Sequence, residues 1–439
     1  MRDYRLASLA ILFLAVAACS NSNNNVSPDA KDAVTDKVTT EVKADVQVET
    51  PEDTPADMAP TDVPAAEVPT TDGGADAGDA QSDVATTEGG GDAAVEAKPP
   101  HLVATLLVID QIPDGGFDGS PDAGSDGGPT FDPNAVNSWG LQINPAGPIW
   151  VANNGTGTAT VYNAQGQPFP VGTPIIVTIP TNADGGTSPS SPTGEVFNFT
   201  SGFMADKFIW STENGTIAGW SSGTTAVTRA DNSATMAIYK GLALGMRNNV
   251  PRLYATDFHN AKVDVYDSGY TKIMTTGGFT DAMIPTGFAP FGVMANGSDI
   301  YVTYAKQDAM KKDDEMGAGN GYVDLFDFDG VLVKRLIAKG ALNSPWGLAL
   351  SPSDFGSLSQ ALLVGNFGDG KINAYDPLTG AFMMTATLST GSPLIIDGLW
   401  SLVFGPDTPG AAHNQLFFTA GPNMEMHGML GRLDFVPTP

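Results

Sequence analysis

The stretch Ile149-Trp150-Val151-Ala152-Asn153 is a short apolar strand ending in a polar residue, and variants of it recur along the chain. The further copies are residues 209–213, 253–257, 300–304, 362–366 and 416–420. The copies lie about 53 residues apart on average, a spacing typical of repeat architectures. Each is followed by a turn and another strand. Six such units predict an all-β fold, a six-bladed β-propeller.

A short apolar strand is also expected before each copy. These strands begin at Trp139-Gly140-Leu141, Gly202-Phe203-Met204, Gly241-Leu242-Ala243, Phe291-Gly292-Val293, Trp346-Gly347-Leu348 and Trp400-Ser401-Leu402. The run 102–108 has no copy elsewhere, so we expect it to add an outer strand to the last blade and close the ring. Two stacked β-sandwiches are the alternative, which the single period across all six copies disfavours.

Cys19 is the one cysteine in 439 residues, and it directly follows an apolar stretch, residues 6–18, that ends in small residues. Arg2 and Arg5 give the preceding segment positive charge. This pattern predicts a lipoprotein signal peptide at 1–18 and a lipid on Cys19; an ordinary signal peptide is the alternative. The apolar stretch is too short to span a bilayer, so the chain would be anchored to a bacterial membrane rather than threaded through it. Ser20 directly follows the cysteine, and a residue other than Asp at this position resembles the pattern of outer-membrane lipoproteins.

Residues 19–100 are predicted to be a disordered acidic tether. Residues 20–100 contain no Phe, Trp or Tyr and carry 18 Asp and Glu against four Lys, which is half of the chain's net charge of −28. Such a segment cannot bury enough apolar surface to fold. The propeller is expected over 101–439, with a flexible Asp/Gly-rich insertion at 114–129. The insertion lacks the bidentate Glu of an EF-hand calcium loop.

The sequence lacks the motifs of several classes of enzyme. There is no Gly-x-Ser-x-Gly elbow, no His-Glu-x-x-His pair and no phosphate-binding glycine loop. A lipidated Cys19 would not be available as a nucleophile. The negative net charge argues against nucleic acid as a partner.

The geometry of a propeller predicts where a site would lie. The start of each innermost strand and the end of the next strand meet at one mouth of the channel, so polar residues at these places converge there. The candidate ligand or metal residues are Asn137, Glu213, Asp257, His259, Asn343, Asn366 and Asp397, above an aromatic floor of Trp139, Phe291, Trp346 and Trp400. The alternatives are packing between blades for the Trp residues and turn capping for the Asn and Asp residues.

Two further features bear on this mouth. Asp257-Phe258-His259 places a carboxylate and an imidazole at one strand end, where they could share a metal or act as an acid/base pair. The loop 305–320, with Lys306 and six other charged residues, is either a lid over the channel or a solvated loop.

Several longer runs carry a resemblance. They are Asn137-Ser138-Trp139-Gly140-Leu141, residues 301–308, Gly319-Asn320-Gly321, residues 343–349, residues 365–370, Asp397-Gly398-Leu399-Trp400 and residues 418–423. Together they resemble an uncharacterised family of exported bacterial propellers, similar in style to NHL-repeat proteins. The resemblance implies a six-bladed propeller without an established activity, and the insertion at 114–129 departs from it.

Three functions fit these observations, because propellers serve many purposes. The first is a binding or scaffold module of the cell envelope, anchored to the membrane by its lipid, with a glycan, peptide or protein as partner. The second is a metal-dependent hydrolase or lyase, with Asp257, Asn343 and Asp397 around one divalent cation such as calcium. The third is a purely structural envelope protein. We expect binding, because no complete catalytic constellation is visible.

Overall fold

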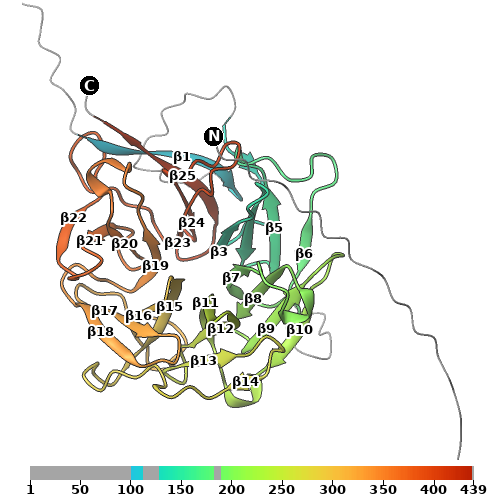
Figure 1. The fold of residues 1–439 in the computed structure, drawn as a ribbon. Coiled ribbons are helices and arrows are strands. Elements are labelled where there is room, and N and C mark those ends of the chain that lie inside the picture. Colours follow the sequence, from blue (N-terminus) through green and yellow to red (C-terminus); the bar gives the residue numbers. More distant parts are fainter. Residues whose placement is uncertain (1–99, 112–127, 182–188, 438–439) are drawn as a thin grey trace, which may run out of the picture. The chain divides into compact units, whose positions relative to one another are not determined.

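The computed structural model describes residues 100–111, 128–181 and 189–437, which fold into six β-sheets around a central channel (Figure 1). The predicted six-bladed β-propeller is therefore confirmed. The predicted signal peptide, the tether up to residue 99 and residues 114–127 of the insertion lie outside the described residues. Within the described ranges, no helix has both the length and the apolar character needed to cross a membrane.

Each blade is a sheet whose strands run in chain order from the channel outward, except for the last blade. The strands of blades 1 to 3 are β3 (Ser138–Ile143), β4 (Ile149–Asn153), β5 (Thr158–Tyr162), β6 (Ile176–Thr178), β7 (Pro192–Phe197), β8 (Phe208–Thr212), β9 (Thr216–Trp220), β10 (Val227–Asp231), β11 (Tyr239–Arg247), β12 (Val250–Asp257), β13 (Lys262–Tyr266) and β14 (Lys272–Ile273). Short 3-10 turns are η1 (Phe203–Ala205), η2 (Ser233–Thr235) and η3 (Gly356–Leu358).

The remaining blades follow the same plan. Their strands are β15 (Phe288–Asn296), β16 (Asp299–Lys306), β17 (Gly321–Asp327), β18 (Leu332–Ala338), β19 (Pro345–Leu350), β20 (Leu362–Asn366), β21 (Ile372–Tyr375), β22 (Phe382–Thr385), β23 (Leu399–Phe404), β24 (Gln415–Ala420) and β25 (Met429–Val436). One expected strand start is wrong: Phe203-Met204 lies in η1, and the innermost strand of blade 2 is β7.

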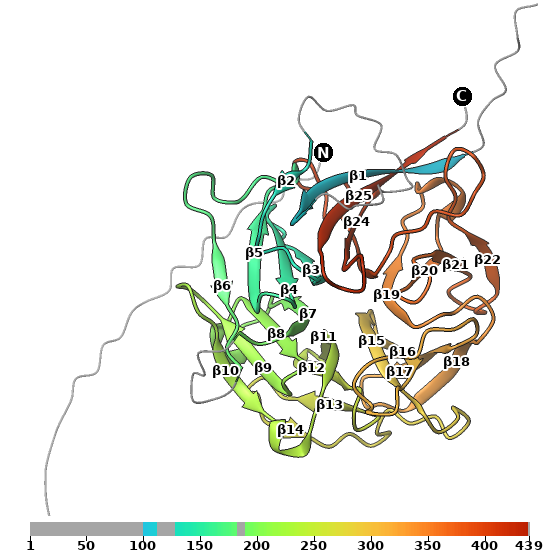
Figure 2. The ribbon, with the colours of Figure 1, turned by 180° about the vertical axis from the view of Figure 1, so that it is seen from behind.

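The first described strand closes the ring. β1 (His101–Ile109) pairs antiparallel with β25, the last strand of the chain, and β2 (Thr130–Phe131) pairs with β1. β1 and β25 lie side by side in both views (Figures 1 and 2). The prediction that residues 102–108 complete the last blade is confirmed, so both ends of the folded segment are held in blade 6.

Alternating side chains join each blade to its two neighbours. In β8, Phe208 and Trp210 pack toward blade 1, whereas Ile209 between them packs toward blade 3. This alternation follows from the strand period of two. Six apolar clusters of this kind fill the spaces between blades, and a seventh lies at the centre of the ring.

The innermost strands share a bulge where they approach one another. Each shows a register shift near its start. In β3, β15 and β19 the shift falls at the predicted starts Trp139-Gly140, Phe291-Gly292 and Trp346-Gly347. A Cβ at Gly140 would lie 2.5 Å from the carbonyl oxygen of Thr193 in the next blade, and one at Gly241 would lie 2.9 Å from that of Phe291. Glycine at this position therefore allows neighbouring blades to come into backbone contact.

A hydroxyl clip joins the blades at this bulge. Thr303 Oγ1 in β16 accepts a hydrogen bond from the Gly292 N–H in its own blade and donates one to the Pro345 carbonyl in the next, both at 2.7 Å. Thr256 forms the same clip to Phe291. Thr419 forms it to Trp139 across the ring closure. Each clip satisfies two backbone groups that the bulge leaves without ladder partners.

Replacing Thr303 by Val should destabilise the protein with little change in the shape of the side chain. The Gly292 N–H and the Pro345 carbonyl then stay buried without a partner, which costs about 1–3 kcal/mol of the free energy of unfolding. The measurement is the chemical unfolding midpoint of the full chain, with Thr303→Ser as the control that keeps the hydroxyl. A Val variant that unfolds at or above the midpoint of the Ser variant would contradict the clip.

Candidate functional site

An aromatic plug fills one end of the central channel. It comprises Trp139, Phe258, Phe291, Trp346, Phe367 and Trp400, every one of them buried. The Trp139 and Trp400 rings stack with centroids 3.5 Å apart, and the Trp346 ring meets both edge-on. The four residues of the expected aromatic floor thus come together from four different blades. They pack against one another at the channel rather than in separate spaces between blades.

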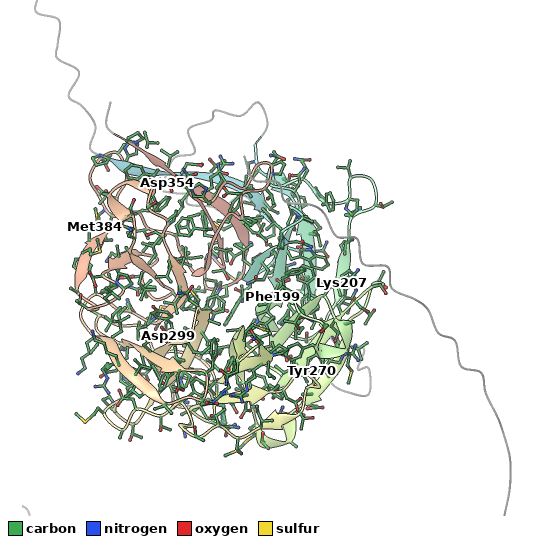
Figure 3. The ribbon with its side chains drawn as sticks, in the orientation of Figure 1. Phe199, Lys207, Tyr270, Asp299, Asp354 and Met384 are labelled. Atoms are coloured by element: carbon green, nitrogen blue, oxygen red, sulfur yellow. The ribbon has the colours of Figure 1, made fainter. Side chains whose placement is uncertain are left out.

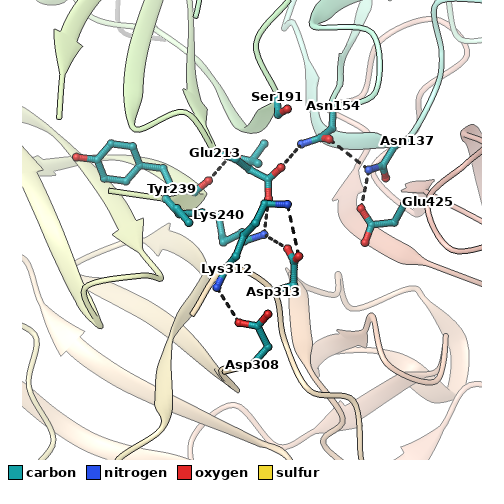
Figure 4. Close-up of polar contacts among 12 residues, drawn as sticks. Asn137, Asn154, Ser191, Glu213, Tyr239, Lys240, Asp308, Lys312, Asp313 and Glu425 are labelled. Carbon is teal, nitrogen blue, oxygen red and sulfur yellow. Dashed lines mark hydrogen bonds and ion pairs between the residues drawn. The ribbon is translucent and has the colours of Figure 1, made fainter. Parts of the chain in front are cut away.

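A polar network lies beside the plug, and it consists of Asn137, Asn154, Glu213, Lys240, Asp313 and Glu425 (Figure 4). Its centre is Lys240, whose Nζ donates to Glu213 at 2.5 Å and to Asp313 at 3.1 Å. Asn154 joins Glu213 to Asn137, whose amide in turn donates to Glu425 at 2.7 Å. The network therefore connects loops and strands of five blades across the mouth.

The network is also bonded to the plug below it. Trp346 Nε1 donates to the Lys240 carbonyl at 3.0 Å, and Trp400 Nε1 donates to Asn137 Oδ1 at 3.2 Å. Lys240 Nζ lies 5.1 Å from the centroid of the Trp139 ring, within range of a cation–π contact. The plug and the network together close this end of the channel.

Lys240 keeps its charge although its residue is only 1% exposed. Burial by itself would lower the pKa of Lys240, but the Glu213 and Asp313 carboxylates outweigh burial and raise that pKa above its usual value. A buried ammonium held by two carboxylates is a structural cross-link between blades 2, 3 and 4.

The other predicted site residues lie at this same end and mostly cap turns. Asp257 accepts from Asn260 and from the Ile238 N–H. Similar contacts to nearby loops are made by Asn343 with the Gly317 N–H, Asn366 with the Ala341 carbonyl, and Asp397 with the Asn423 N–H. His259 Nδ1 is buried without a hydrogen bond. Their role in binding a ligand stays a prediction.

The predicted metal site also stays a prediction. Among the described residues, no group of three or more His, Cys, Asp or Glu side chains is placed to hold a metal ion. The loop 305–320 does reach over the mouth, since its Asp313 bonds Lys240. Lys306 of this loop pairs with Glu315.

Behind the plug the channel widens into a central cavity of about 470 Å³. Its wall comes from the innermost strands of all six blades, and Trp346 belongs to both the plug and the wall. At the other end the wall includes Phe199, which is 62% exposed, and the exposed Pro145 and Asn296. Phe199 lies near the centre of the ring (Figure 3). The cavity is thus closed by the plug and reaches the surface at the mouth opposite the predicted site.

Sequence reasoning missed Lys240, Asn154 and the wall residue Glu195. Aligning the bulges shows why: Lys240-Gly241-Leu242 and Thr193-Gly194-Glu195 correspond to Trp139-Gly140-Leu141. Lys240 takes the place of an aromatic residue, and Glu195 takes that of an aliphatic one. A polar residue inside the aromatic–glycine–aliphatic repeat was the signal that could have identified both.

Replacing Lys240 by Met should leave the Glu213 carboxylate without its buried counter-ion. Removing one partner of a buried ion pair costs about 3–5 kcal/mol of the free energy of unfolding. Lys312→Met is the control, because Lys312 is half-exposed and its pair with Asp313 contributes at most about 1 kcal/mol. Chemical unfolding of the full chain measures both.

The double variant Lys240→Met/Glu213→Gln should recover part of that stability, since it removes the uncompensated carboxylate. A Lys240→Met variant as stable as the Lys312→Met control would refute the cross-link.

Comparisons with known proteins place the chain among relatives. No protein-family model matches it. Uncharacterized protein R648 of Acanthamoeba polyphaga mimivirus is 31% identical over 323 residues, which cover 69% of this chain and 76% of that protein. Uncharacterized protein L690 of the same virus is 29% identical over 69% of this chain and 81% of its own length.

Among solved structures, a catalytically inactive virginiamycin B lyase from Staphylococcus aureus, crystallised with quinupristin, aligns with a TM-score of 0.43 at 13% identity. The alignment covers 76% of this chain and 96% of the lyase. The two sequence relatives are viral, so the exported bacterial character implied by the sequence resemblance stays a prediction. The identity and coverage of the first relative show that this chain belongs to the same protein family as R648 of Acanthamoeba polyphaga mimivirus.

Proposed function

We propose that this protein is a ligand-binding propeller whose site is the central cavity, held at a bacterial cell envelope by a lipid on Cys19. The observation that carries the proposal is the cavity of about 470 Å³, closed at one end by the aromatic plug. Its size lies within the range of about 300–1,000 Å³ that small-molecule sites occupy. Most residues of its wall are aliphatic, aromatic or Gly, and Gln142, Glu195, Asn296 and Ser401 add polar side chains. This lining suits a ligand that has both an apolar body and polar groups.

In this proposal the two ends of the channel have different roles. Lys240, Trp346 and Trp400 make their hydrogen bonds within this end of the channel, so the plug and the polar network hold the blades and form the floor of the site. The open end admits the ligand past Phe199.

Filling the cavity should weaken the binding of an apolar probe. The full chain should enhance the fluorescence of N-phenylnaphthylamine, a neutral hydrophobic dye, and Ala295→Phe should weaken this binding about tenfold or more, because the added ring occupies the wall near the mouth. Ala338→Phe, an exposed site on β18, is the matched control. Equal dye binding by both variants, or none by the parent chain, would refute the cavity as the site.

Replacing Cys19 by Ser should release the protein from membranes. The serine cannot be acylated, and without its lipid the chain loses the anchor that the proposal gives it. Fractionation of bacteria that produce the full chain, together with labelling by a fatty-acid analogue, measures both properties. Membrane association that survives in the Ser variant, or a parent chain that takes up no label, would refute the anchor.

A further inference from the structure

One side chain breaks the pattern of the cavity wall. At the position after the bulge glycine, which is Ser401 in blade 6, five innermost strands carry an aliphatic residue and the sixth carries an acid. The aliphatic residues are Leu141, Leu242, Val293, Leu348 and Leu402, and in β7 the equivalent residue is Glu195. Glu195 is the one ionisable residue in the described wall of the cavity.

The carboxyl group of Glu195 has no counter-charge in the described structure, and the donor beside it is the indole N–H of Trp210. The residue is 3% exposed, and neither carboxyl oxygen makes a hydrogen bond. Its side chain lies toward blade 1, beside its cross-strand neighbour Trp210, whose indole N–H is also unbonded. A Cβ at Gly140 would lie 2.8 Å from the Glu195 Cβ, so the glycine makes room for it. The site therefore accommodates this acid and leaves it unsatisfied.

The burial of Glu195 affects the ionisation of its carboxyl group. Burial raises its pKa well above the usual value, and the nearby Trp210 opposes the shift only in part. An unpaired buried carboxylate is expensive, so the empty cavity favours the neutral acid. An aliphatic residue, as in the other five blades, would carry no such cost. A cation in the cavity would remove it by supplying the missing partner.

We propose that the central cavity binds an organic cation, an ammonium group attached to an apolar body, and that Glu195 is its anchor. The inference rests on the proposed function, since it names the ligand class for the same site. On binding, the Glu195 side chain turns from Trp210 toward the cavity and releases its proton to solvent, and the ammonium then donates hydrogen bonds to the carboxylate. The apolar body contacts the aliphatic wall, with Phe197 and Phe199 nearer the mouth.

The test is calorimetric titration of the full chain with two probes of the same shape, naphthylmethylammonium and naphthylmethanol, at neutral pH. The cation should bind about tenfold tighter or more, because a charge-assisted hydrogen bond forms only with it. Proton release should make the measured heat depend on the ionisation heat of the buffer. Glu195→Gln and Glu195→Leu should bind both probes equally, whereas Glu425→Gln, at the other end of the channel, should keep the preference.

The outcomes separate the two proposals. If the alcohol binds and the cation binds no tighter, the inference fails and the proposed function stands. If neither probe binds the parent chain, the proposed function fails as well. A cation preference that survives in Glu195→Gln would overturn the role of Glu195.

The unliganded protein provides a second readout. Because the folded state raises the pKa of Glu195, its contribution to stability is present at low pH and is lost as pH rises above the unfolded value of about 4.3. Glu195→Gln should therefore unfold at a higher midpoint than the parent chain at pH 8, and the difference should shrink toward pH 4. A variant less stable than the parent at pH 8 would show that the carboxylate already has a partner in the empty cavity.

Discussion

The close approach of neighbouring blades at the bulge of each innermost strand is the constraint on which the rest of this propeller depends. A bulge at the start of each innermost strand leaves backbone groups that the sheet cannot pair, and after blades 3, 4 and 6 a Thr hydroxyl from the second strand pairs them with the next blade. The clip works only where the backbones approach closely, and glycine at the bulge permits that approach. Hydrogen bonding and steric fit thus set the distance between neighbouring blades at one level along the channel.

The contents of the channel follow from that spacing. Side chains immediately before the bulge converge from all sides, so large aromatic rings there stack and fill the space. Side chains after the bulge turn toward the previous blade, as Leu242 and Leu348 do, and join the clusters between blades. The channel is therefore full at one level and hollow at the next, and a single local motif produces both the floor and the cavity.

Two ionisable residues interrupt this motif, with opposite consequences. Lys240 replaces an aromatic residue at the filled level, where Glu213 and Asp313 are within reach and compensate its charge. Glu195 replaces an aliphatic residue at the hollow level, where the described structure offers no counter-charge. The first substitution strengthens the closed end. The second makes the open end chemically distinctive, because a buried acid beside a cavity favours a ligand that can pair with it.

The sequence by itself determined the number of blades, the strand order and the closure of the ring by residues 102–108, because strand periodicity and repeat spacing are properties of neighbouring residues. It also predicted that Trp139, Phe291, Trp346 and Trp400 meet at one floor, since they share one position in the repeat. It misplaced the start of blade 2, where Thr193 and Glu195 obscure the motif and strand pairing alone identifies β7. Only the tertiary structure decided that the predicted mouth is closed, that the opposite one is open, and that Lys240 is paired while Glu195 is not. Burial and charge compensation depend on groups from different blades, and only the closed ring brings those groups together.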